Sequence, residues 1–173
     1  MRSAEAAIAL LAVAASAGEA ADFRGLRPGE SCAGIAARES TLGSRPLNAG
    51  DATGGIYLFA GQETGHAVTI TYWCRDDLLI RGGYLFAQLP RPEAFALYEQ
   101  WRRRLEDELG KAAYDIASPE HQAKMREFDV PVAETDRHSA YWRAPGLEIH
   151  LSRYAIASDG SWDVSVLFLP PRR

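Results

Sequence analysis

The run AVTITYWCRDDLLIRGGYLFA, residues 67–87, constrains the fold more than any other part of the chain. β-Branched and aromatic residues lie on both sides of an acidic pair, Asp76 and Asp77, which is typical of two strands joined by a hairpin turn. Strand side chains alternate between the faces of a sheet. One face of the first strand therefore collects four apolar side chains: Val68, Ile70, Tyr72 and Cys74. We predict that this face meets the core, and Trp73 lies on the opposite face.

The return strand of this hairpin has two alternative registers. In the favoured register its core face carries Ile80, Tyr84 and Phe86, which requires an odd-length or bulged turn. A slip of one residue inverts the assignment and turns the alternate side chains inward.

From Pro92 the apolar spacing changes to the period of a helix. The apolar stripe consists of Ala94, Leu97, Tyr98, Trp101, Leu105 and Leu109. Gly110 follows directly and is typical of a helix end. We predict a long amphipathic helix here and a shorter one near residues 118–125, within a connection.

Three more strands are predicted at residues 139–143, 147–157 and 162–169. Asp159 and Gly160 are typical of a two-residue hairpin turn between the last two, which sets Ala155 opposite Val164. Arg153 interrupts the apolar face of this hairpin. We interpret it as an edge residue whose stem lies along apolar surface, and the alternative is a buried charge.

The two halves of the chain share a plan. Helical stretches end in Leu42-Gly43 and Leu109-Gly110, and each half continues with a short strand that contains a tyrosine and with a long hairpin. We predict an α+β fold in which two helix-plus-three-strand repeats, about residues 23–88 and 91–170, form an antiparallel sheet with the helices packed on one face.

This layout resembles β-lactamase inhibitory protein and the small envelope lipoproteins of the SmpA/OmlA type. The stretches that carry the resemblance are LRPGESCAGIAARESTLGSRPL and EAFALYEQWRRRLEDELGKAAYD, two amphipathic helices that each end in Leu-Gly. The resemblance implies the fold and a habit of binding other proteins. It implies no site residues.

Residues 1–20 have the features of an export signal. Arg2 precedes an apolar core at residues 6–15, and small residues follow at 15–17. That core is too short to cross a bilayer, which takes about 20 apolar residues. The alternative is an ordinary alanine-rich helix. We predict a cleaved signal peptide at 1–20 and a single domain at 21–173, periplasmic or secreted, without stable membrane insertion.

The charge of the chain limits its possible partners, and its cysteines indicate its compartment. The chain has 19 Lys and Arg against 23 Asp and Glu, a net charge of −4, and so lacks the basic excess of nucleic-acid-binding proteins. Cys32 and Cys74 lie in the exported part, where an oxidising environment favours a disulfide between them. Two buried free thiols are the alternative. Cys32 lies too far beyond the apolar core to be a lipid acceptor.

No motif of a known catalytic class is present. The chain has no His-Glu-x-x-His, glycine-rich phosphate loop or Gly-x-Ser-x-Gly. We predict no catalytic residue and no cofactor. The best metal candidates are Glu148 and His150, which share one face of a strand, with His138 as a further donor. A full site needs three or four ligands, so we interpret the pair as polar residues of a strand face.

The aromatic residues suggest a surface for a partner. We predict that Trp73, Trp142 and Tyr154 contribute to it, and that the chain is a non-catalytic module that binds another envelope or extracellular protein. The other use of these rings is packing in the core or between strands. One alternative is a small envelope metal-binding protein or hydrolase. Another is a cell-wall or glycan-binding module that uses these rings as a stacking platform.

Overall fold

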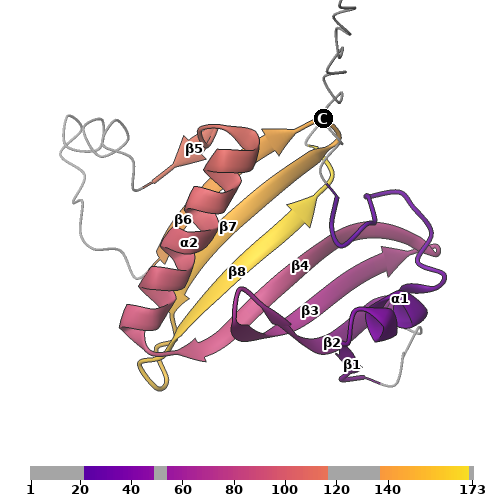
Figure 1. Ribbon diagram of the computed structural model, residues 1–173, viewed down its shortest axis with the longest axis horizontal. Helices are drawn as coiled ribbons and strands as arrows, with labels where there is room; N and C mark the ends of the chain where they lie inside the picture. Colours follow the sequence, from indigo (N-terminus) through magenta and orange to yellow (C-terminus); the bar gives the residue numbers. More distant parts are fainter. Residues whose placement is uncertain (1–21, 49–53, 117–136, 172–173) are drawn as a thin grey trace, which may run out of the picture.

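One antiparallel sheet of eight strands makes up most of the fold (Figure 1). The computed structural model describes residues 22–48, 54–116 and 137–171. In spatial order the strands are β1 (Arg45–Pro46), β2 (Ile56–Glu63), β3 (His66–Arg75), β4 (Leu78–Leu89), β8 (Trp162–Leu169), β7 (Leu147–Ala155), β6 (Arg137–Ala144) and β5 (Tyr114–Asp115). Two helices, α1 (Ile35–Thr41) and α2 (Arg91–Leu109), complete the described elements.

The predicted α+β arrangement of two helix-plus-three-strand repeats is wrong. Strand β4 pairs with β8, so strands from both halves of the chain form one continuous sheet that dominates the fold. The two helices are also unequal, with seven residues in α1 and 19 in α2. The order of elements along the chain suggested two similar units. It contained no information on the long-range pairing that merges them.

Both helices pack on the same face of the sheet. Tyr72 of β3 donates a hydrogen bond to Glu39 of α1, and the Tyr84 ring of β4 lies 5.6 Å from the Trp101 ring of α2. Tyr72 pairs with Gly82, two residues before Tyr84, so the two tyrosines point to the same side. Figure 1 shows α1 and α2 on the near side of the sheet. We call this the helix face and the opposite side the open face.

Helix α2 confirms the predicted stripe. Its buried residues are Ala94, Leu97, Tyr98, Trp101 and Leu105, and Gly110 ends it. Gly82 of β4 leaves room for the Phe23 ring on the same face, because a Cβ at position 82 would lie 1.9 Å from that ring. Phe23 contacts the rings of Tyr72, Tyr84 and Phe168, and so joins the N-terminal segment to both halves of the sheet.

Arg153 is buried within this core. Its side chain is on β7, which lies between β6 and β8, so the edge interpretation is wrong. The guanidinium carbon lies 3.2 Å from the centre of the Phe95 ring, and Tyr98 and Trp162 are the next aromatic neighbours. The charge therefore faces the aromatic rings under α2.

The predicted hairpin of β3 and β4 is present and contains a bulge. Trp73 pairs with Arg81 and Cys74 with Leu79, which leaves Ile80 as the extra residue. Leu79, and not Ile80, therefore reaches the core. The rest of the strand has the predicted alternation.

The hairpin of β7 and β8 differs from the prediction in register. Ala155 pairs with Trp162, two residues away from the predicted pairing with Val164. The connection is longer than a two-residue turn, and the Ile156 amide donates to the Ser161 carbonyl within it. A slip by two residues keeps every side chain on its predicted face.

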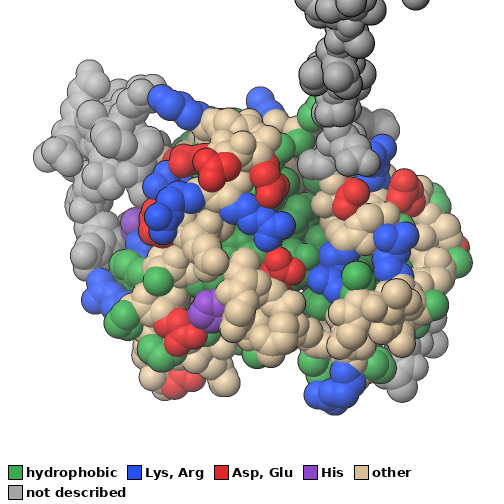
Figure 2. Space-filling view, viewed as in Figure 1, with side chains coloured by type: hydrophobic (Ala, Val, Ile, Leu, Met, Phe, Trp, Pro, Cys, Tyr) green, Lys and Arg blue, Asp and Glu red, His purple; other side chains and the backbone are tan. Residues whose placement is uncertain are grey.

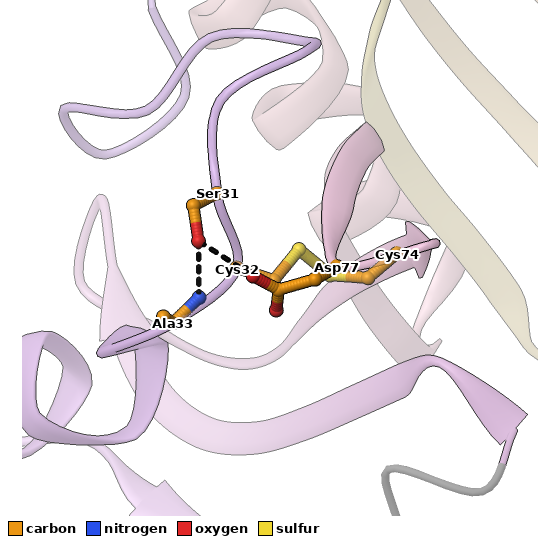
Figure 3. The surroundings of a disulfide bond; sticks show 5 residues. All are labelled: Ser31, Cys32, Ala33, Cys74 and Asp77. Atoms are coloured by element: carbon orange, nitrogen blue, oxygen red, sulfur yellow. Dashed lines mark hydrogen bonds between the residues drawn. A yellow bond between two sulfur atoms is a disulfide. The ribbon is translucent and has the colours of Figure 1, made fainter.

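The predicted disulfide joins Cys32 to Cys74, with Cα atoms 6.4 Å apart. Figure 3 shows it beside the Ser31 hydroxyl, which donates to the Asp77 carboxylate at 2.8 Å and accepts the Ala33 amide at 3.0 Å. These contacts fix the N-terminal segment to the end of β3.

Two predicted segments, the export signal at 1–20 and the helix near 118–125, lie outside the described residues. Neither α1 nor α2 has the length and apolar composition of a membrane-spanning helix.

Candidate functional site

The open face presents a row of side chains that crosses seven strands. The pairing register places its members side by side, one from each of β2, β3, β4, β8, β7, β6 and β5: Leu58, Thr71, Gly83, Leu167, His150, Tyr141 and Tyr114. Neither described helix covers this row. Among the described elements, this face of the sheet is therefore left without a helix packed on it.

Three rings stack against one another at one end of the row. The Tyr114 and Tyr141 rings are 5.7 Å apart at an interplanar angle of 16°, and the His150 ring lies 5.6 Å from Tyr141. The Arg143 guanidinium lies 5.6 Å from the Tyr141 ring centre. Because the rings face each other across the strands, their faces are largely occupied and are a poor platform for a sugar.

A buried carboxylate lies next to these rings. Glu148 is 4% exposed. Its oxygens lie 3.5 Å from Arg143 Nε and 3.6 Å from His150 Nε2. Glu148 and His150 thus share a face, as predicted, and lie close together.

The structure does not complete a metal site around this pair. His138 pairs with Arg153, whose side chain is in the core, and therefore lies on the helix face, away from His150. Within the described ranges no group of three or more His, Cys, Asp or Glu residues could hold a metal ion.

A second cluster lies near the end of β3, around Trp73. The Arg81 guanidinium carbon lies 4.0 Å from the centre of the Trp73 ring, a cation–π contact. Gly83 permits close packing beside it, because a Cβ there would lie 2.7 Å from Leu167 Cδ2 and 3.6 Å from Trp73 Cζ3. The indole therefore lies between the arginine and the sheet backbone.

The surface around Trp73 is hollowed, and apolar and charged side chains share it. Ile56 and Leu78, which flank it on the open face, are 39% and 46% exposed. A cavity of about 550 Å³ opens here, and its lining includes Trp73, Arg75 and Asp76. We call Ile56, Trp73, Leu78 and Arg81 the tryptophan patch.

The other two predicted surface residues have different positions. Trp142 is buried under α2, where its indole N–H donates to the Gly110 carbonyl at 3.0 Å, so a partner cannot reach it. Tyr154 lies on the open face opposite Asp163. Burial raises the pKa of the Tyr154 hydroxyl, and the neighbouring carboxylate raises it further.

Sequence reasoning placed Trp73 on the correct face but did not select Arg81 or Tyr114 as site residues. The favoured register places Arg81 on the face opposite Tyr84, which is the open face, and only the strand pairing shows that it lies beside Trp73. Tyr114 had no local signal, because β5 has only two residues.

A buried polar cluster on the helix face contrasts with these open-face groups. Glu39 is fully buried and accepts hydrogen bonds from Arg24 Nε at 2.7 Å, from Arg24 Nη2 at 3.0 Å and from the Tyr72 hydroxyl. Burial raises the pKa of Tyr72, and the adjacent Glu39 carboxylate raises it further. Desolvation lowers the pKa of Arg24, but the hydrogen bonds and charge interactions with Glu39 and Tyr84 together outweigh it, so the pKa is raised.

Comparison of the chain with protein-family models, curated proteins and solved structures found no match. The resemblance to β-lactamase inhibitory protein and to the SmpA/OmlA lipoproteins therefore stays a prediction from the sequence.

Proposed function

We propose that this chain is a non-catalytic module that binds another protein of the periplasm or extracellular space through its open face. The tryptophan patch is the observation that carries the proposal. It joins a half-buried indole to two exposed aliphatic side chains, Ile56 and Leu78, on an ordered sheet. Aromatic and arginine side chains are enriched in the centres of protein interfaces.

The disulfide supports the proposed location. A bond between Cys32 and Cys74 is stable in oxidising compartments and rare in the cytosol. An export signal at residues 1–20 would deliver the chain to such a compartment.

The contacts of the rings favour a protein over a glycan as partner. A sugar stacks on an open ring face, whereas the Trp73 ring already contacts Arg81, and Tyr114 and Tyr141 contact each other. Mixed apolar and charged groups on a broad surface suit the core and rim of a protein interface.

The test uses two pairs of exposed aliphatic residues. Ile56→Ala with Leu78→Ala removes apolar surface from the tryptophan patch, and Leu42→Ala with Leu47→Ala removes a comparable amount elsewhere. The mature protein is immobilised, and partners retained from an envelope extract are identified by mass spectrometry. We expect at least one partner to be lost by the first variant and by Trp73→Ala and kept by the control.

Equal retention by all three variants would contradict the proposal. Retention on peptidoglycan or polysaccharide that Trp73→Ala abolishes would instead identify a glycan-binding module. Stoichiometric zinc or copper in the purified protein, lost in Glu148→Gln, would favour the metal-binding alternative.

A further inference from the structure

The arginines of the described chain differ in whether a carboxylate neutralises them. Most of those with a carboxylate partner lie on the helix face or on α2, where Arg24 binds Glu39, Arg102 binds Glu99 and Glu106, and Arg104 binds Glu63 and Glu108. Figure 2 shows red and blue side chains close together over α2. These charges are satisfied within the chain.

Arg81 is different. Its contact within the described residues is the Trp73 ring, and no carboxylate there lies within ion-pair distance of it. Its Nε is buried and lacks a hydrogen-bond partner among the same residues. Asp76 and Asp77 at the tip of the hairpin form no ion pair with it, and Asp77 instead accepts from Ser31. The buried Nε cannot reach an external group, so the Nη N–H groups are the ones that an external acceptor could bind.

The strands of the open face carry more arginines than carboxylates. The pairing register places five strand arginines on it: Arg45, Arg75, Arg81, Arg137 and Arg143. Its strand carboxylates are Glu148 and Asp163, which are 4% and 9% exposed. Glu148 lies against Arg143, and Asp163 accepts the Gln88 amide at 2.9 Å. On its strands the open face thus carries more arginines than carboxylates, on a chain whose net charge is −4, while Asp76 and Asp77 line the cavity beside Trp73.

We infer that the open face binds an acidic protein segment, with a carboxylate of that segment on Arg81 and a neighbouring apolar side chain on the exposed part of the tryptophan patch. This inference rests on the proposed function and specifies the chemistry of the partner. Stacking on Trp73 holds the guanidinium plane in place before binding, which lowers the entropy lost when the carboxylate docks. Planar, bidentate pairing with carboxylates is characteristic of arginine.

The test is selection from a phage-displayed library of random peptides, with the mature protein as bait. Three further baits are Arg81→Gln, Arg81→Glu and Arg104→Gln, the last as a control because Arg104 lies on α2, outside the open face, and is paired with Glu63 and Glu108. We expect the wild type and Arg104→Gln to enrich Asp or Glu next to apolar residues. A synthetic peptide from that pool should bind Arg81→Gln about tenfold more weakly or worse, and rising salt should weaken its binding to the wild type.

The outcomes separate this inference from the proposed function. Arg81→Glu should lose the acidic peptides and enrich Lys or Arg. If the wild type selects peptides whose binding depends on Trp73 but which are not enriched in Asp or Glu, the inference of an acidic partner is wrong. The proposal that the open face binds a protein is then kept. If no selected peptide depends on Trp73, both are wrong. Circular dichroism of each bait verifies its folding, and Arg81→Gln serves as the bait if Arg81→Glu does not fold.

Discussion

Two neighbouring residues of β3, Tyr72 and Trp73, mark two different uses of arginine. On the helix face, Tyr72 and Arg24 meet the buried carboxylate of Glu39. On the open face, Arg81 stacks on Trp73 without a carboxylate from the described chain. The first arginine is neutralised internally and contributes to the fold. The second has a charge that an external group can satisfy, which is what a binding surface requires.

The largest effect should come from breaking the helix-face cluster. Glu39→Ala leaves the Arg24 charge in a site built to neutralise it, and we expect the free energy of unfolding to fall by about 3–5 kcal/mol. Urea denaturation measures this. Glu99→Ala, which removes a half-exposed partner of Arg102, is the control and should cost less than about 1 kcal/mol. Similar losses of stability in both variants would contradict the distinction between the buried ion pair of Glu39 and the exposed ion pair of Glu99.

The disulfide holds the segment that brings Arg24 to the sheet. Its cysteines are 42 residues apart, and replacing both Cys32 and Cys74 with serine should lower the free energy of unfolding by about 2–4 kcal/mol. Thermal unfolding of the oxidised protein, the reduced protein and the double variant would measure the loss. Unfolding at the same temperature with and without reductant would show that the disulfide contributes nothing to stability.

The buried tyrosine of the helix-face cluster predicts a pH dependence of stability. The pKa of Tyr72 is raised above its ordinary value near 10, so above that pH the unfolded chain loses the proton first. Stability is then fully present below pH 10 and falls as the pH rises, by up to about 1.4 kcal/mol per pH unit for this residue. Tyr72→Phe should flatten the decline measured by urea denaturation. Identical pH profiles for the wild type and Tyr72→Phe would refute this assignment.

The smallest effect should come from the open-face arginine. Arg81→Gln removes a cation–π contact but no internal ion pair, so we expect a loss of about 0.5–1 kcal/mol in urea denaturation. The same variant should still bind the selected acidic peptide about tenfold more weakly or worse. A destabilisation as large as that of Glu39→Ala would show that Arg81 is a structural residue, and would remove the contrast between the two faces.

Local patterns predicted the parts of this fold that depend on neighbouring residues. The helical stripe of α2, the hairpin at Asp76 and Asp77 and the burial of Ile70 and Tyr72 follow from spacing alone. The alternation also placed Trp73 on the face opposite Tyr72. Local pattern left open whether Trp142 packs in the core or faces a partner, because the hydrogen bond that fixes it joins it to Gly110, 32 positions away.

By itself, the sequence determined which side of its strand most residues occupy, because side chains alternate with a period of two whatever the strand pairs with. Only the tertiary structure decided the pairing of β4 with β8, the register of β7 against β8 and the neighbours of each charge. A slip of two residues leaves the alternation unchanged, so local pattern cannot detect it. Long-range contacts also decided that Arg24 meets a carboxylate while Arg81 meets an indole, and this difference is the basis of the proposed binding site.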